Sequence, residues 1–169
     1  MLERIIISGF GGQGIMLIGR LLAYAGMIEG KKVAWMPSYG PEMRGGTANC
    51  TVIISSNEIG SPIVSHPKIL IAMNQPSLDK FESNVSQDGL IILNDSLIER
   101  EVKKNDVHVI KIPADDIAEK LGNSRAANMV VLGAYVEQSG IVKMDTIFKA
   151  LDKALACLLY TSPSPRDRS

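Results

Sequence analysis

The feature that most constrains the fold is a short apolar run that ends in a glycine-rich turn and continues into a second apolar segment. Residues 4–8 read Arg-Ile-Ile-Ile-Ser, and residues 9–14 read Gly-Phe-Gly-Gly-Gln-Gly. Residues 15–28 are apolar apart from Gly19, Arg20 and Gly26. A short apolar run bounded by a turn is typical of a buried strand, and a longer apolar segment after it favours a crossover helix. The chain is therefore predicted to begin with a strand, a turn and a helix.

The same alternation continues along the chain. Further strands are predicted at 33–36, 47–55, 68–73, 89–94 and 107–112, and further helices at 76–82, 114–121, 124–139 and 144–156. A helix is one option for the polar segment between 95 and 106. The strands are apolar throughout, which indicates a sheet covered on both faces, and the order of strands and helices favours parallel pairing. We predict a three-layer α/β fold, with a mostly parallel, Rossmann-like sheet and helices on both faces.

Composition bounds the class of protein. The chain has 169 residues, of which 46% are hydrophobic and 21% charged, and this suits one globular domain. Lys plus Arg and Asp plus Glu both number 18, so no net field attracts nucleic acid or an anionic membrane. No apolar run approaches the length of a membrane span, and the N-terminus lacks the features of a signal peptide. We expect a cytoplasmic protein without nucleic-acid or membrane partners.

Potential metal ligands are sparse. The two cysteines, Cys50 and Cys157, are too few for an iron–sulfur cluster, which takes about four thiolates. His66 and His108 do not stand at metal-ligand spacing from a cysteine or from each other. Cys50 lies in a predicted strand and is interpreted as a small core residue. We expect no metal site on this chain, so any cluster would belong to another chain.

The last residues differ sharply in composition from the rest. Residues 157–169 read Cys-Leu-Leu-Tyr-Thr-Ser-Pro-Ser-Pro-Arg-Asp-Arg-Ser, a segment whose composition is typical of a disordered tail. It resembles the translation of a transposase-type sequencing adaptor. We therefore predict one domain over 1–156 and an artefactual, disordered tail over 157–169.

The glycine turn has more than one interpretation. Gly9, Gly11 and Gly14 fit the pattern G-x-G-x-x-G between a strand and a helix, where backbone N–H groups offer an anion site. An autonomous nucleotide-binding oxidoreductase of the Rossmann type would also need an acidic residue about 20 positions later, to bind ribose. That place is taken by residues 36–38, which read Met-Pro-Ser. A tight turn that only lets the helix pack closely on the sheet is the structural alternative.

A second loop also carries chemically specific residues. Residues 38–46 read Ser-Tyr-Gly-Pro-Glu-Met-Arg-Gly-Gly, in which three glycines permit close backbone approach. Arg44 offers forked donors that match a phosphate or carboxylate, and Tyr39 is of a type enriched at interfaces. Glu42 either orients Arg44 or binds a partner chain, and a purely structural ion pair between these two is the alternative. Because carboxyl ends of parallel strands share one edge, we expect both loops to lie side by side there.

Together, the motifs at 9–14 and 38–46 resemble the gamma subunit of the 2-oxoacid:ferredoxin oxidoreductases. Further similar stretches are 60–64, 72–74, 76–81 and 128–130. The resemblance implies a subunit of an enzyme that uses coenzyme A to decarboxylate a 2-oxoacid oxidatively, giving acyl-CoA, carbon dioxide and reduced ferredoxin. It leans toward 2-oxoglutarate or branched-chain 2-oxoacids. It places thiamine diphosphate and magnesium on alpha and beta partners, and 4Fe-4S clusters on the beta chain or a delta chain.

The resemblance implies no catalytic residue on this chain, which alone is expected to be inactive. It associates the gamma chain with coenzyme A, although no cofactor is assigned to this chain alone. A purely structural assembly subunit is a third interpretation. The candidate residues for cofactor binding or the subunit interface are Gly9, Gly11, Gly12, Gln13, Gly14, Ser38, Tyr39, Gly40, Pro41, Glu42, Arg44, Gly45, Gly46 and Asn128. For Asn128, contact with the glycine turn is one interpretation, and an amide satisfied within the fold is the alternative.

Overall fold

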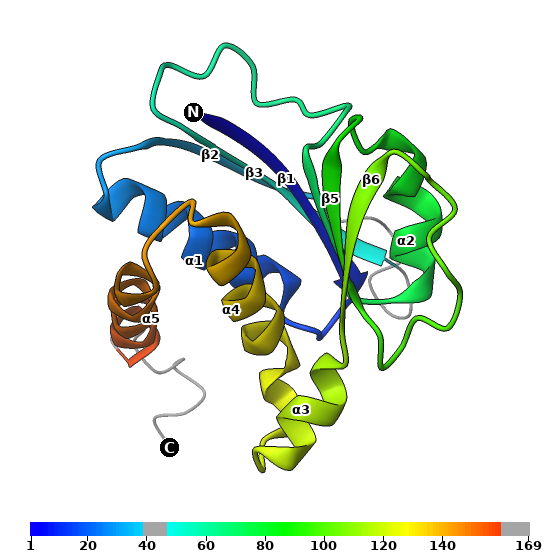
Figure 1. Cartoon of the computed structure of the whole chain (residues 1–169). Coiled ribbons are helices and arrows are strands. Elements are labelled where there is room, and N and C mark those ends of the chain that lie inside the picture. The colour runs from blue at the N-terminus through cyan, green and yellow to red at the C-terminus, as the bar shows by residue number, and fades with distance from the viewer. Residues whose placement is uncertain (39–46, 160–169) are drawn as a thin grey trace.

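The computed structural model describes residues 1–38 and 47–159 (Figure 1). The predicted elements form close to their predicted bounds. The strands are β1 (Leu2–Phe10), β2 (Lys32–Ser38), β3 (Thr47–Ser55), β4 (Ile69–Ala72), β5 (Gly89–Asn94) and β6 (Val107–Ile112). The helices are α1 (Ile15–Ile28), α2 (Gln75–Phe81), α3 (Ala114–Lys120), α4 (Ala127–Ser139) and α5 (Met144–Leu159), with short 3₁₀ turns η1 (Glu82–Asn84) and η2 (Ser124–Ala126).

The six strands form one sheet in the order β2-β3-β1-β4-β5-β6. β1, β4, β5 and β6 pair in parallel, whereas β3 is antiparallel to both of its neighbours, β1 and β2. All strands except β3 therefore run in one direction, and the prediction of a mostly parallel sheet is confirmed. β3 is the exception because it follows β2 after only residues 39–46, and antiparallel neighbours need no long crossover.

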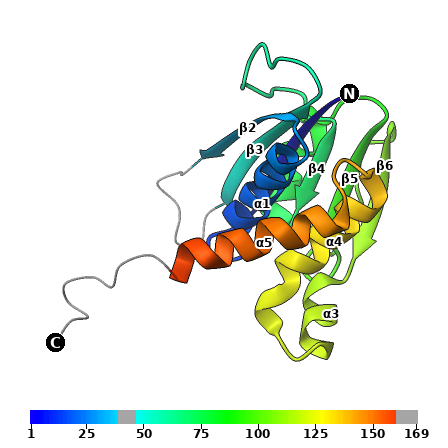
Figure 2. The same cartoon turned by 90° about the vertical axis from the view of Figure 1, so that its left-hand side faces the viewer.

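Helices cover both faces of the sheet, as predicted. Figure 2 and Figure 1 together place α1, α4 and α5 on one face and α2 on the other. Successive residues of β1 serve the two faces, because Ile5 and Ile7 belong to the core under α1 and Ile6 belongs to the core under α2. This double burial explains why β1 is apolar throughout. The three-layer α/β fold is confirmed.

The connection from β5 to β6 departs from the sequence-based options. Residues 95–106 contain turns and bends but no helix. β5 and β6 nevertheless pair in parallel. Arg100 and the backbone amides of Lys103 and Lys104 bond this segment to α2 and η1. The option of a helix there is not realised.

α5 continues past the predicted end of the domain. The helix runs to Leu159, and Ile147, Ala150 and Ala154 bury its inner face against the core. The predicted boundary at 156 thus lies inside the last turn of the helix, and the tail beyond the described residues stays a prediction. Within residues 1–38 and 47–159, no helix combines the length and the apolar character that crossing a membrane requires.

A side chain distant in sequence caps α5. Glu29 lies directly after α1, and its Oε1 accepts a hydrogen bond from the Lys143 amide at 2.6 Å, just before α5 begins. Its Oε2 pairs with Lys31 Nζ at 2.8 Å. Partial burial alone would raise the pKa of Glu29, but the bonds from Lys143, Lys31 and Thr146 lower that pKa to about 2. Glu29 therefore fastens the end of α1 to the start of α5, where a backbone donor would otherwise lack a partner.

Candidate functional site

The glycine turn connects β1 to α1 by a backbone path that other residues rarely adopt. Gly12 has φ +93° and Gly14 has φ +75°, both in the left-handed region. The Gln13 amide donates to the Phe10 carbonyl at 3.2 Å and closes the turn. Gly14 is the N-cap of α1. Glycine is needed at positions 12 and 14 because a side chain there would strain the backbone.

Gly9 permits close packing between segments of the chain. A Cβ at this position would lie 2.5 Å from Gln13 Oε1 and 2.9 Å from Met73 Cβ, distances that no ordinary side chain tolerates. The end of β1 can therefore approach both the turn and the residue that follows β4. The packing interpretation of the motif accounts for Gly9.

The Gln13 side chain links the turn to the neighbouring strand. Its Oε1 accepts from the Phe10 amide at 2.6 Å, and its Nε2 donates to the Met73 carbonyl at 3.4 Å. The same carbonyl accepts from Asn94 Nδ2 at 3.4 Å, and this nitrogen also lies 2.6 Å from Asp115 Oδ2. Amide side chains thus connect β1, β4, β5 and the first turn of α3 along one edge of the sheet.

Asn128 reaches the glycine turn from α4, which is one of the two interpretations that the sequence left open. Its Nδ2 donates to the Gly14 carbonyl at 3.4 Å, and the residue is 6% exposed. A Cβ on Gly14 would lie 2.2 Å from this nitrogen, so the contact depends on the glycine. The predicted neighbourhood is present, whereas a role in ligand binding stays a prediction.

The second loop is placed through its two ends. Ser38 pairs with Asn49, and Thr47 pairs with Phe10 at the end of β1. Both ends of the loop therefore lie at the edge that carries the glycine turn, although β3 rather than a direct β1–β2 contact brings them there. The remaining candidates of this loop, Tyr39, Gly40, Pro41, Glu42, Arg44, Gly45 and Gly46, lie outside the described residues.

A polar cleft opens beside the glycine turn. It encloses about 470 Å³ and is lined by Gly12, Gln13, Met73, Asp115, Ser124, Arg125, Ala127 and Asn128. Of its lining residues, Gly12 and Gln13 follow β1 and Met73 follows β4. The helices after these two strands, α1 and α2, pack on opposite faces of the sheet (Figures 1 and 2). Such a switch point at the carboxyl ends of strands is the usual ligand position in open α/β sheets.

Sequence reasoning missed the three other polar side chains of this cleft. Asp115, Ser124 and Arg125 follow β6 and lie about 100 positions after the glycine turn, where no motif marks them. The available signal was position, because Asp115 comes soon after the carboxyl end of a predicted strand. Together with Gln13 and Asn128, they offer a carboxylate, a hydroxyl, a guanidinium and two amides to a polar ligand.

An apolar groove lies on the other side of the same turn. It encloses about 300 Å³ and is lined by Phe10, Gly11, Gly12, Gly14, Ile15, Met16, Leu17 and Ala48. Phe10 is 36% exposed, and Met16 and Leu17 are half-buried. Gly12 lines both hollows. The glycine turn is therefore a ridge between a polar cleft and an apolar groove.

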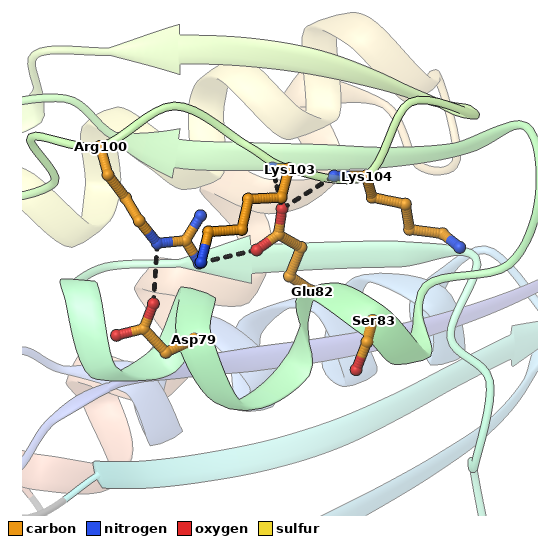
Figure 3. Close-up of a pocket in the computed structure, with 6 residues that line it drawn as sticks. All are labelled: Asp79, Glu82, Ser83, Arg100, Lys103 and Lys104. Atoms are coloured by element: carbon orange, nitrogen blue, oxygen red, sulfur yellow. Dashed lines mark hydrogen bonds and ion pairs between the residues drawn. The ribbon is translucent and has the colours of Figure 1, made fainter.

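A larger hollow of about 740 Å³ lies elsewhere, between α2, η1 and the segment 95–106 (Figure 3). At its centre Glu82 is 8% exposed and accepts from Arg100 Nη2 at 2.6 Å, the Lys104 amide at 3.0 Å and the Lys103 amide. Arg100 Nε also bonds Asp79 at 2.8 Å. Burial alone would raise the pKa of Glu82, but these donors hold it below its usual range. Arg100 pairs with both Asp79 and Glu82, so this hollow is interpreted as a clamp on the segment 95–106.

The Cys50 thiol and the potential metal ligands provide no further candidate site. Cys50 is fully buried in the core, and burial raises the pKa of its thiol to about 12. Its interpretation as a core residue is confirmed. Among the residues that the structure describes, no group of three or more His, Cys, Asp or Glu side chains could hold a metal ion.

Comparison with known proteins decides the family. Residues 4–158 match the family described as pyruvate ferredoxin/flavodoxin oxidoreductase. The chain belongs to this family. Ketoisovalerate oxidoreductase subunit VorA of Methanothermobacter marburgensis is 45% identical over 142 residues, which are 84% of this chain and 29% of VorA. The 2-oxoglutarate synthase subunit KorC of Methanocaldococcus jannaschii is 36% identical over 154 residues, which are 89% of this chain and 82% of KorC.

Solved structures agree with the membership in the pyruvate ferredoxin/flavodoxin oxidoreductase family. The gamma subunit of a keto/oxoacid ferredoxin oxidoreductase from Geobacter sulfurreducens superposes with a TM-score of 0.76 at 29% identity, covering 95% of this chain and 87% of that one. The fold also occurs in the 2-oxoglutarate:ferredoxin oxidoreductase of Magnetococcus marinus, with a TM-score of 0.83 at 22% identity, covering 92% of this chain and 27% of that one. The chain thus spans less than a third of VorA and most of KorC.

Proposed function

We propose that this chain is the gamma subunit of a multi-subunit 2-oxoacid:ferredoxin oxidoreductase. The observation that carries the proposal is the match of residues 4–158 to the pyruvate ferredoxin/flavodoxin oxidoreductase family. It is supported by 36% identity over 154 residues to KorC, which is named as a subunit. Its partners in this proposal are alpha and beta chains, with a delta chain in some arrangements, and ferredoxin meets the complex rather than this chain alone.

The proposed reaction is the oxidative decarboxylation of a 2-oxoacid with coenzyme A, giving acyl-CoA, carbon dioxide and reduced ferredoxin. Thiamine diphosphate, magnesium and 4Fe-4S clusters, held by the partner chains, supply the carbon and electron chemistry when bound. The residues of this chain bind and orient, and none of them forms a covalent bond to the substrate. The isolated chain is accordingly inactive in this proposal.

The proposed substrate is a branched-chain 2-oxoacid. Two VorA relatives, named for ketoisovalerate, are 45% and 49% identical to this chain, whereas the KorC relatives from the same genus are 36% identical. KorC is named for 2-oxoglutarate and matches this chain over most of its length, so 2-oxoglutarate is the second candidate.

The polar cleft is proposed to serve coenzyme A. Arg125 suits its phosphates, and Asp115, Gln13 and Asn128 suit its hydroxyl and amide groups. The Magnetococcus marinus oxidoreductase is described with coenzyme A and succinyl-CoA bound, which supports this choice of ligand. Arg44 of the second loop is proposed to act on the same ligand.

Reconstitution tests the proposed function. Alpha and beta chains with and without this chain would be assayed for coenzyme A-dependent oxidation of 2-oxoisovalerate and 2-oxoglutarate, with an artificial electron acceptor. We expect turnover only when this chain is present, with 2-oxoisovalerate preferred. Turnover by the isolated chain, or an alpha–beta pair that needs no third chain, would refute the proposal.

Ligand titrations separate the alternatives. An autonomous nucleotide-binding oxidoreductase would bind NAD(P)H saturably as an isolated chain, and we expect no such binding. A purely structural assembly subunit would tolerate Arg125→Ala and Arg44→Ala without change in the KM for coenzyme A. We expect that KM to rise by about tenfold for each while the complex still assembles.

A further inference from the structure

We infer that the apolar groove beside the glycine turn receives an apolar side chain of the partner polypeptide, so that the partner forms the facing wall of the polar cleft. This inference rests on the proposed function and adds to it the surface through which the subunit docks. Its elements are the exposed ring of Phe10, the half-buried side chains of Met16 and Leu17, and the buried floor of Ile15 and Ala48.

The exposed apolar residues of the groove differ from others of the described chain in that they lie together around one hollow. Ile63, Leu97 and Leu121 are 72%, 42% and 73% exposed and line no apolar hollow among those found. Phe10, Met16 and Leu17 instead surround one depression whose floor is fully or nearly buried. Binding energy at interfaces concentrates where an apolar anchor fills such a desolvated pocket.

The length of the relatives identifies the occupant. In VorA this domain makes up 28–29% of the polypeptide, and in the Magnetococcus marinus chain the same fold makes up 27%. The remainder of those polypeptides is tethered to this domain and is therefore present near its surface at high effective concentration. In the present chain, which matches the separate subunit KorC, the same contact is made by a partner chain.

Gly12 explains why groove and cleft are used together. It lines both hollows, and an added Cβ at this position would meet nothing within 4 Å. The turn therefore presents a bare backbone ridge that a partner can approach closely. A partner seated in the groove lies directly beside Gln13, whose side chain faces the polar cleft. The ligand in the cleft is then bound at the boundary between two chains.

Substitution in the groove tests the inference. Phe10→Asp and Leu17→Asp would be titrated against co-purified alpha and beta chains, with Ile63→Asp as a control that places the same charge on an exposed aliphatic position outside the groove. We expect the Kd to rise by at least about tenfold for both groove variants and to stay within about threefold for Ile63→Asp. Circular dichroism and thermal melting verify that each variant is folded.

Hydrogen exchange on the wild-type chain keeps the test independent of folding defects. On complex formation, amides of residues 10–17 should exchange at least about tenfold more slowly, whereas those near Ile63 should not change. Folded groove variants that bind normally, or unaltered exchange at 10–17, would overturn the inference. So would a wild-type homodimer that Leu17→Asp abolishes, because the occupant would then be a second copy. Wild-type chain that binds no alpha or beta chain would instead refute the proposed function.

Discussion

Gly14 and Asn128 lie 114 positions apart and meet at a separation that leaves no room for a side chain on the glycine. Gly14→Ala adds a methyl group 2.2 Å from Asn128 Nδ2 and also strains a backbone with φ +75°. We expect it to lower the free energy of unfolding by about 2–3 kcal/mol, measured by urea denaturation.

Two comparisons separate the causes of that loss. Gly12→Ala has a similarly positive φ of +93° but open space around it, so it should cost only about 1 kcal/mol. Adding Asn128→Ala to Gly14→Ala should recover part of the stability. If Gly12→Ala lowers the free energy of unfolding as much as Gly14→Ala does, the clash with Asn128 does not contribute to the destabilisation.

Glu82 is the second residue whose environment makes a definite prediction. Glu82→Gln removes the negative charge that accepts from Arg100 and the amides of Lys103 and Lys104. Since the carboxylate is 8% exposed, the free energy of unfolding should fall by about 2–3 kcal/mol in urea denaturation at pH 7. The control Glu101→Gln breaks the exposed pair with Lys111 and should leave stability unchanged. Equal stability of the two variants would contradict the clamp.

At the scale of elements, the cap that Glu29 provides to α5 makes stability depend on pH. An acid whose pKa is lower in the folded than in the unfolded chain stabilises the fold above its unfolded pKa, and this contribution is lost as the pH falls through the folded value. For Glu29 the window runs from about pH 5 down to about pH 2. Wild type should exceed Glu29→Gln by about 1–2 kcal/mol at pH 7, and much of this gap should vanish at pH 3.

Paired unfolding curves at several pH values check this prediction. Glu58→Gln is the matched control, because Glu58 pairs with Lys32 while 86% of its side chain is exposed. Its difference from wild type should be small and independent of pH. A gap for Glu29→Gln that stays constant between pH 7 and pH 3 would show that charge has no part in the cap.

The elements themselves were largely predictable, as was the mostly parallel pairing, but the antiparallel direction of β3 was not. The apolar runs that became β1, β4 and β5 predict strands because they are short and bounded by turns. The residues of β3 indicate a strand equally well, but nothing in their side chains distinguishes parallel from antiparallel pairing. Its direction follows from the short connection after β2 once the two strands are known to be neighbours. Only the strand order of the sheet shows that they are. The segment 95–106 was ambiguous because its charged residues bond to Glu82, far away in sequence.

At the scale of the whole molecule, the site could be predicted only in part. Gln13 was found because it lies in a motif, and contact with the glycine turn was one of two interpretations of Asn128. Asp115 and Arg125 reach the same cleft only because β6 and α3 return the chain to that edge. A motif identifies residues that are adjacent in sequence, whereas a cleft collects residues that the topology brings together.

Truncation of the chain tests the prediction of an artefactual C-terminal tail. We expect a chain that ends at Leu159 to unfold at the same Tm as the 169-residue chain, because the core contacts of α5 come from Ile147, Ala150 and Ala154. A chain that ends at Lys143 lacks those contacts and should have a much lower Tm. A clear fall in Tm on removing 160–169 alone would contradict the interpretation of this tail as artefactual.

The antiparallel strand β3 has one more implication. Its register fixes Ser38 against Asn49 and Thr47 against Phe10, so both stems of the second motif are fastened to the sheet before the motif itself begins. We expect that residues 39–46 can be exchanged for those of a relative without loss of the sheet, because these pairings lie outside the exchanged segment. Chimeras of that kind would reveal how much of a relative's selectivity depends on residues 39–46.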